Sequence, residues 1–158
     1  MKLALVAFAL LALAMASACG SDDNDNVDAP TVSIDTLEIV VGEQSETVLA
    51  VLEFDSPGLG AWTVDIQYDN GVVSVIECEP LPEGNVCNPA YTDDTVRVVG
   101  ATGTGLEGDT LIGRITFQCD VAGESELDII IDLLADGTLG DPREIVPIIE
   151  NGAITCTE

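Results

Sequence analysis

Apolar and polar side chains alternate along most of this chain, and this period of two restricts its fold more than any other feature. In residues 62–68 the aromatic and aliphatic side chains occupy the even positions and the polar ones the odd positions. Such alternation is typical of a β-strand with one buried and one solvated face. No segment keeps a helical period for three turns. The same spacing of apolar residues recurs at Val48/Ala50/Leu52/Phe54, Leu111/Gly113/Ile115/Phe117/Cys119 and Leu127/Ile129/Ile131/Leu133.

The segments between these runs are rich in turn residues. Glycine, asparagine and aspartate favour tight turns because they tolerate backbone angles that other residues avoid. Many short strands joined by such turns, without intervening helices, predict an all-β antiparallel sandwich of about nine or ten strands. The turn sequences are Ser56-Pro57-Gly58, Asp69-Asn70-Gly71, Gly103-Thr104-Gly105, Glu107-Gly108-Asp109, Ala122-Gly123 and Asp136-Gly137.

The N-terminal residues have the features of an export signal. Lys2 precedes an apolar run over residues 3–18, which ends in small residues before Cys19. This ending resembles the lipobox of bacterial lipoproteins, which implies that residues 1–18 are cleaved and that Cys19 is lipidated. An ordinary signal peptide or an uncleaved anchor are the alternatives, because Ala16 stands where the lipobox favours leucine. The resemblance predicts an extracytoplasmic protein that acyl chains hold on a membrane.

The next segment predicts a spacer between lipid and domain. Residues 19–30 are acidic, lack periodicity and end at Pro30, as expected of a flexible tether. A single domain over residues 31–158 is then long enough to bury one hydrophobic core.

The charge of the chain excludes one class of partner. It has 29 acidic and 4 basic residues, a formal net charge of −25. Phosphate backbones repel such a chain, so nucleic acid is not expected as a partner. Anionic headgroups repel it too, which leaves the lipid as the only expected membrane contact. Adaptation to a saline habitat or solubility explains the acidity most simply, and binding of divalent cations is the alternative.

The composition also argues against catalysis. The chain has no histidine, which rules out Ser-His, Cys-His and zinc-protease arrangements within it. A carboxylate pair could hydrolyse glycosides, but it would need a cleft lined by aromatic side chains. After the leader the chain has only five aromatic residues. We therefore expect a non-enzyme without a cofactor. The five aromatic residues are Phe54, Trp62, Tyr68, Tyr91 and Phe117.

Four cysteines remain besides Cys19, and an even number in an oxidising compartment predicts two disulfides. Cys78 and Cys87 bracket a loop rich in proline and glycine that a bridge would pin. Cys119 and Cys156 each end a strand, in phase with buried neighbours. The expected pairs are therefore Cys78 with Cys87 and Cys119 with Cys156. The spacing does not fit a Cys-x-x-Cys metal or redox site.

The order of these features resembles a cohesin domain over roughly residues 31–157. The matching segments include residues 61–69 followed by 72–75, the glycine-rich 103–105, residues 111–117 and the closing Asn151-Gly152 strand. The resemblance implies a nine-stranded jelly-roll sandwich without catalytic activity. It also implies a protein partner, the calcium-loaded helical dockerin, in polysaccharide-related or surface assemblies. The chain has Ala61-Trp62-Thr63 where dockerin-binding cohesins often carry Asn-x-Asp, so the fold can be kept while the partner differs.

If a flat sheet face binds a protein, exposed positions on two strands are the candidates. An ordinary solvated surface is the alternative for all of them, because protein interfaces depend on a few desolvated anchors and none of these residues is aromatic. Arg114 is the strongest candidate, although pairing with a neighbouring carboxylate is its plainer role. The six candidate residues are Thr63, Asp65 and Gln67 on one strand, and Arg114, Thr116 and Gln118 on the other.

The sequence is also compatible with two other functions. Carbohydrate binding would need aromatic rings exposed in a row, but Trp62 has the parity of a core residue. A calcium site could use Asp132, Asp136 and Asp141. Because Leu134 and Arg143 stand where an EF-hand needs oxygen ligands, we favour an acidic turn there and expect no metal.

Overall fold

The structure, a computed structural model, describes residues 29–158. The predicted leader, Cys19 and most of the predicted tether lie outside the described residues. Residues 29–158 contain no helix that is long and apolar enough to cross a membrane. The fold within them is all-β, as the alternating pattern predicts.

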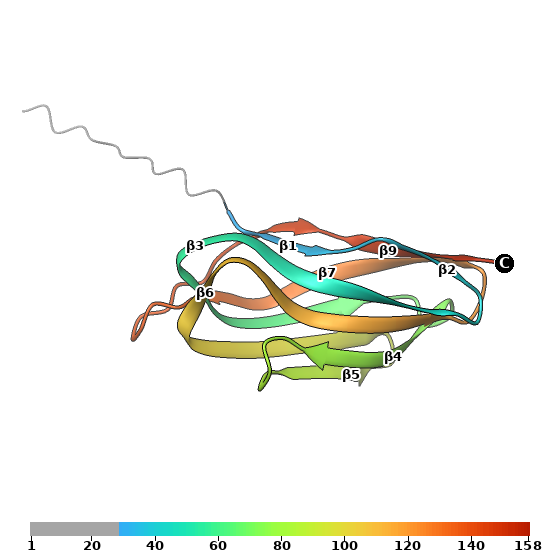
Figure 1. Cartoon of the computed structure of the whole chain (residues 1–158), viewed down its shortest axis with the longest axis horizontal. Coiled ribbons are helices and arrows are strands. Elements are labelled where there is room, and N and C mark those ends of the chain that lie inside the picture. The colour runs from blue at the N-terminus through green and yellow to red at the C-terminus, as the bar shows by residue number, and fades with distance from the viewer. Residues whose placement is uncertain (1–28) are drawn as a thin grey trace, which may run out of the picture.

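Nine strands form the domain (Figure 1), and almost all pair antiparallel. The parallel pairs are the short ones, β1 with β8 and β2 with β9. The strands are β1 (Thr31–Ile34), β2 (Leu37–Val40), β3 (Gln44–Gln67), β4 (Val73–Pro80), β5 (Val86–Thr92), β6 (Thr95–Cys119), β7 (Gly123–Asp136), β8 (Ile148–Glu150) and β9 (Gly152–Thr157).

Two long strands, β3 and β6, each run through both layers of the sandwich. In the first layer, residues 44–54 of β3 pair with β1 and with residues 108–118 of β6, and β4 and β8 complete it. In the second layer, residues 59–67 of β3 lie between β7 and residues 95–106 of β6, flanked by β5, β9 and β2. The core fills the space between the layers, and Trp62, Phe117 and Leu49 are its largest fully buried side chains.

Irregular pairing carries β3 from one layer to the other. The β3–β6 register shifts several times between Leu49 and Ala61, and Glu53 adopts a positive φ of 58°. Gly58 also has a positive φ, 78°, and a Cβ there would lie 2.7 Å from the backbone of Leu106. Only glycine fits such a close approach without strain. The turn sequence Ser56-Pro57-Gly58 therefore lies inside a strand that bends, rather than between two separate strands.

These bulges make part of the predicted parity wrong. In the first half of β3, Thr47, Leu49 and Val51 face the core, whereas Val48 and Leu52 are only partly buried. Each bulge adds a residue on one strand and so exchanges the inward and outward positions beyond it. For the same reason Ile112 and Leu134 are fully buried, while the predicted core residues Leu111 and Leu133 are exposed.

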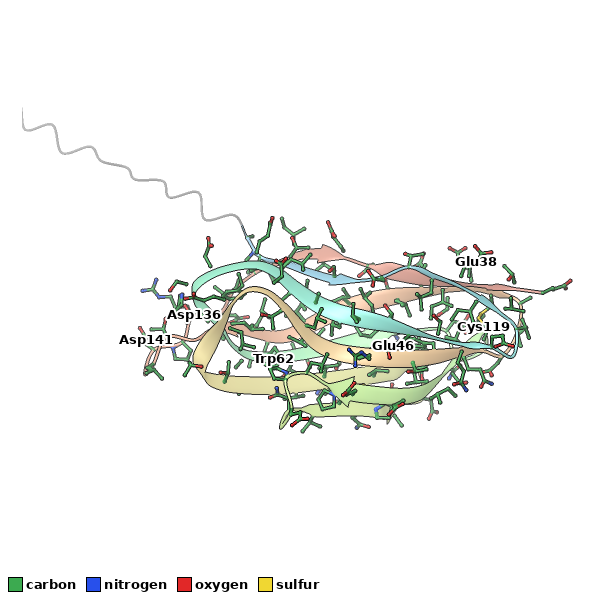
Figure 2. The ribbon with its side chains drawn as sticks, in the orientation of Figure 1. Glu38, Glu46, Trp62, Cys119, Asp136 and Asp141 are labelled. Carbon is green, nitrogen blue, oxygen red and sulfur yellow. A yellow bond between two sulfur atoms is a disulfide. The ribbon has the colours of Figure 1, made fainter. Side chains whose placement is uncertain are left out.

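Both disulfides join the two layers. Cys78 of β4 is bonded to Cys87 of β5, and Cys119 at the end of β6 to Cys156 of β9. This is the pairing that the sequence predicts. Figure 1 shows β4 and β5 along one long side of the sandwich, and Figure 2 places Cys119 at one end. The bridges thus hold the layers together at two separate places.

Candidate functional site

The two outer faces of the sandwich differ in chemistry. On the second layer, apolar side chains surround a group of charged ones; we call this surface the Arg97 face. On the outer face of the first layer, polar side chains gather around Arg114; we call this group the Arg114 face, and the exposed apolar residues Ile76, Leu111, Ile148 and Ile149 belong to the same layer but not to this group. The Arg97 face comprises Thr63, Asp65, Val86, Tyr91, Arg97, Val99, Ile130, Asp132 and Leu133, and the Arg114 face comprises Gln44, Glu46, Glu77, Glu79, Arg114, Thr116 and Gln118.

Strand register brings the charged residues of the Arg97 face together. Asp65 of β3 lies directly opposite Arg97 of β6. Arg97 Nε donates to Asp65 Oδ1 and Nη2 donates to Oδ2, both at 2.6 Å. A guanidinium held by two parallel hydrogen bonds has a fixed orientation. These hydrogen bonds raise the pKa of Arg97 further above its usual value, so it remains a cation.

A bulge adds a second carboxylate to this group. The β3–β7 register shifts between Thr63 and Val64, so that Leu133 and Ile131 are paired and Asp132 is not. The Asp132 carboxylate forms an ion pair with Arg97 Nη2. The ring of Tyr91 lies on the other side of the guanidinium, 3.8 Å from Cζ, which is cation–π geometry. Strands β3, β5 and β7 thus each place a side chain against Arg97 of β6.

Apolar side chains border this charged group. Val99 of β6 is paired with Thr63 of β3 and with Val86 of β5, and Leu133 is paired with Thr63 from the other side. Ile130 is paired with Asp65. Directly paired residues point to the same side of a sheet, so all of these side chains project outward. Val86, Tyr91, Ile130 and Leu133 are exposed.

The six sequence-predicted residues divide between the two faces. Thr63 and Asp65 lie on the Arg97 face, and Gln67 follows at its end, donating to Asp94 Oδ2 at 3.4 Å. The expectation that Asp65 is exposed is wrong, since it is only 7% exposed beneath Arg97. Arg114, Thr116 and Gln118 are on the opposite face of the sandwich, so the two groups cannot contact the same flat surface.

Arg114 has the plainer role that the sequence suggested. Its Nε lies 2.9 Å from Glu46 Oε1, and its Nη1 donates to Glu79 Oε2 at 2.7 Å. Gln118 accepts a hydrogen bond from Gln44 at 3.0 Å. Most of the polar side chains of the Arg114 face are therefore already paired with one another.

We expect Arg114→Ala to leave partner binding unchanged within about two-fold, because its guanidinium is already paired with Glu46 and Glu79 on the Arg114 face. The free energy of unfolding should fall by at most about 1 kcal/mol, as is usual for exposed ion pairs. Titration calorimetry and urea unfolding of the variant measure both effects. A ten-fold loss of affinity would place the interface on the Arg114 face.

The residues that sequence reasoning missed are Arg97, Tyr91 and Asp132. One signal was available, because Arg97 is one of three arginines in a very acidic chain. Its partner could not be identified without the β3–β6 register. Asp132 points to Arg97 because of a bulge, and the sequence does not show where a bulge lies.

The aspartates proposed as a calcium loop do not converge. Asp132 pairs with Arg97, whereas Asp136 Oδ1 accepts backbone hydrogen bonds from Thr138 at 3.1 Å and from Arg143 at 3.0 Å. Within residues 29–158, no group of three or more side chains of metal-binding type is arranged to hold an ion. The loop after β7 is held by the turn around Asp136, at the end of the molecule opposite Cys119 (Figure 2).

The hydrogen bond from the Arg143 backbone, with those from Thr138, lowers the pKa of Asp136 below its usual value. A carboxyl group with a depressed pKa stabilises the fold above its unfolded-state pKa of about 3.9, and this contribution disappears as the pH falls through the folded-state value. Asp136→Asn should therefore be less stable than the parent near pH 6, with a difference that shrinks below about pH 4. Urea unfolding across that range tests this. Asp141→Asn, which removes a charge from the same loop but neither hydrogen bond, should not show this pH dependence.

Comparisons with known proteins identify the fold. No family model and no curated protein matches the sequence. Among solved structures, a type I cohesin of ScaB from Pseudobacteroides cellulosolvens is 16% identical, with a TM-score of 0.73 over 82% of this chain and 92% of that one. A non-cellulosomal cohesin from the archaeon Archaeoglobus fulgidus is 16% identical, with a TM-score of 0.70 over the same shares. A chain from a type I cohesin–dockerin complex of Clostridium thermocellum is 20% identical, with a TM-score of 0.70 over 82% of this chain and all of that one.

Proposed function

We propose that residues 29–158, which have the cohesin fold of a jelly-roll sandwich, form a non-catalytic binding module that docks a protein partner on the Arg97 face. The observation that carries the proposal is the ion pair of Arg97 with Asp65, which is oriented by two hydrogen bonds and bordered by four exposed apolar or aromatic side chains. The polar residues around Arg114 are instead mostly paired with one another. Protein interfaces combine such apolar contacts with a few oriented charged groups.

The proposed partner is a dockerin-type module. Several of the similar structures are complexes of a cohesin with a dockerin, which favours the same class of partner here. The face carries one cation and two carboxylates, and Asp132 is the more exposed of the two. A helical module that presents apolar side chains and a lysine or arginine toward Asp132 fits this surface. The chain would then hold a partner protein in a polysaccharide-related or surface assembly.

The module is proposed to be extracytoplasmic and lipid-anchored through Cys19. The apolar run over residues 3–18 that ends at Cys19 supports this proposal. The 12 residues over positions 19–30 would reach about 40 Å if they were extended. The sandwich could then stand clear of a bilayer that repels its negative charge. Cys19→Ala should release the protein from the membrane fraction. Retention of the unlipidated variant in that fraction would contradict the anchor.

The partner can be captured directly. Residues 27–158 contain both disulfides and the whole described core, so they are suitable for immobilisation. Secreted and membrane extracts of the source organism are passed over the domain with calcium or with a chelator, and bound proteins are identified by mass spectrometry. We expect calcium-dependent capture of a protein that contains a dockerin-type module. Capture that is equal on an Arg97-face variant, Leu133→Asp, would mean that the partner binds elsewhere.

A further inference from the structure

A pocket beside the buried Trp62 is separate from the face proposed for the protein partner. It has a volume of about 240 Å³ and is lined in part by the loop that joins β4 to β5. The bond between Cys78 and Cys87 closes this loop at its base. The lining residues that matter here are Trp62, Pro82, Glu83, Asn85, Thr102 and Leu106.

Trp62 contributes an unused hydrogen-bond donor to this pocket. The side chain is completely buried, and its Nε1 has no hydrogen-bond partner. Buried polar groups without partners are rare in folded proteins and need an explanation such as a bound ligand or water. An indole N–H left unpaired in the interior lowers the stability of the fold, and a hydrogen-bond acceptor would offset that loss.

The indole edge that carries Nε1 faces the loop side. A Cβ on Gly100 would lie 2.1 Å from Cζ2 and 2.3 Å from Cε2 of Trp62, and 2.8 Å from Asn85 Oδ1. Gly100 is therefore needed to let this edge approach β6. Because Cε2 is bonded to Nε1, the N–H is at the same edge as Asn85 and the loop. The tryptophan thus meets the pocket with its edge and not with its ring face.

The loop above the pocket is held in a defined shape. Asn85 Nδ2 donates to the backbone oxygen of Pro82 at 2.8 Å, and Asn85 Oδ1 accepts from the backbone of Ala101 at 3.1 Å. Both polar ends of Asn85 are therefore used to fix the loop against β6. Gly84 has a positive φ of 95° and open space around its Cβ position. Gly84, which lines the pocket, therefore narrows it with no side chain.

The polar groups left for a ligand define its chemistry. The indole N–H only donates, so the ligand must accept a hydrogen bond, while an ionised Glu83 only accepts, so the ligand must also donate. Hydroxyl groups do both. An anion would be repelled by Glu83 and by the net charge of −25, and an ammonium group offers Trp62 no acceptor.

We propose that the Trp62 pocket binds one neutral sugar ring edge-on, with a sugar hydroxyl accepting from Trp62 Nε1 and another donating to Glu83. The volume equals that of about eight water molecules, which suits a single ring better than an extended chain. Pro82 and Leu106 supply apolar contacts for the ring carbons. The ring could be a free monosaccharide or the terminal unit of a glycan, which present the same hydroxyl groups. This site differs from the row of stacked aromatic residues that sequence reasoning sought.

The chain has only one tryptophan, so one indole N–H resonance reports directly on this pocket. The ¹⁵N-labelled domain, residues 27–158, is titrated with glucose and galactose, each as the free sugar and as the methyl glycoside. We expect at least one sugar to shift the indole N–H resonance in a saturable manner. Binding of the methyl glycoside would point to a glycan end, and binding of the free sugar alone to a monosaccharide. Sodium acetate, compared with sodium chloride at the same ionic strength, should not shift the indole N–H resonance.

Two matched variants make the test specific. Glu83→Ala should weaken the titration at least about ten-fold, because it removes a hydrogen bond to a charged group. Glu107→Ala removes an exposed carboxylate that does not line the pocket, and it should titrate like the parent. Leu133→Asp should also titrate like the parent, whether or not the protein partner docks as proposed. An indole resonance that no sugar shifts, or equal titration of Glu83→Ala and the parent, would overturn the proposal and leave only water in the pocket.

Discussion

Replacing Cys119 and Cys156 together with serine should lower the free energy of unfolding by about 4 kcal/mol. The bond closes a loop over a sequence separation of 37 residues, and its loss increases the chain entropy of the unfolded state by roughly that amount. It also joins β6 of one layer to β9 of the other. Both sulfur atoms belong to the buried core, so the serine hydroxyl groups would add a desolvation cost.

The second disulfide provides a matched comparison for this prediction. Cys78 and Cys87 are only 9 residues apart, so their replacement by serine should cost about 3 kcal/mol. Urea unfolding followed by the fluorescence of Trp62 measures both double variants. The order of the two effects is the test. If replacing Cys78 and Cys87 lowered the free energy of unfolding more, the length of the closed loop would not determine how much each disulfide stabilises the fold. The hold on the β4–β5 loop would then matter more.

Leu133→Asp should weaken partner binding at least about a hundred-fold. Leu133 is 39% exposed, and it lies beside Thr63 at the border of the charged group on the Arg97 face. A carboxylate there would remove an apolar contact from the centre of the proposed interface. It would also stand next to Asp132 and so repel a partner surface arranged for one carboxylate.

The control for this variant is Leu111→Asp. Leu111 is also a leucine on an outer surface and is 44% exposed, but it belongs to the first layer, where it is paired with Ala50. The two substitutions therefore change charge and exposed apolar area alike, on opposite faces. Titration calorimetry with the captured partner should give near-parent affinity for Leu111→Asp. Equal losses for both variants would indicate an effect of total charge and would contradict docking on the Arg97 face.

The fold class could be predicted because the apolar period of two survives in most segments. Residues 62–68 show it without interruption, and there the predicted and observed parity agree. The prediction was wrong for Val48 and Leu133, because a bulge shifts the parity of every residue beyond it. Bulges depend on how two strands pair, and one strand's sequence does not contain that information.

The candidate site was predicted only in part for a related reason. Thr63 and Asp65 were found because they are the polar positions of a clear strand. Arg97 was not found because its importance comes from the residue opposite it on another strand. The sequence also does not show to which layer a strand belongs. Thr63 and Arg114 are therefore candidates for one face in the sequence, although they lie on opposite sides of the sandwich. Site prediction therefore needed the register and the layer of each strand in addition to its pattern.

Docking of a protein partner on the Arg97 face should leave its mark on the residues of that face. We would follow the backbone amide resonances of the ¹⁵N-labelled domain while the captured partner is added in the presence of calcium. We predict that the shifted or broadened resonances cluster at residues 63–67, 86–91, 97–99 and 130–133. A cluster at residues 44–48 and 114–118 would contradict this account and place the interface on the Arg114 face.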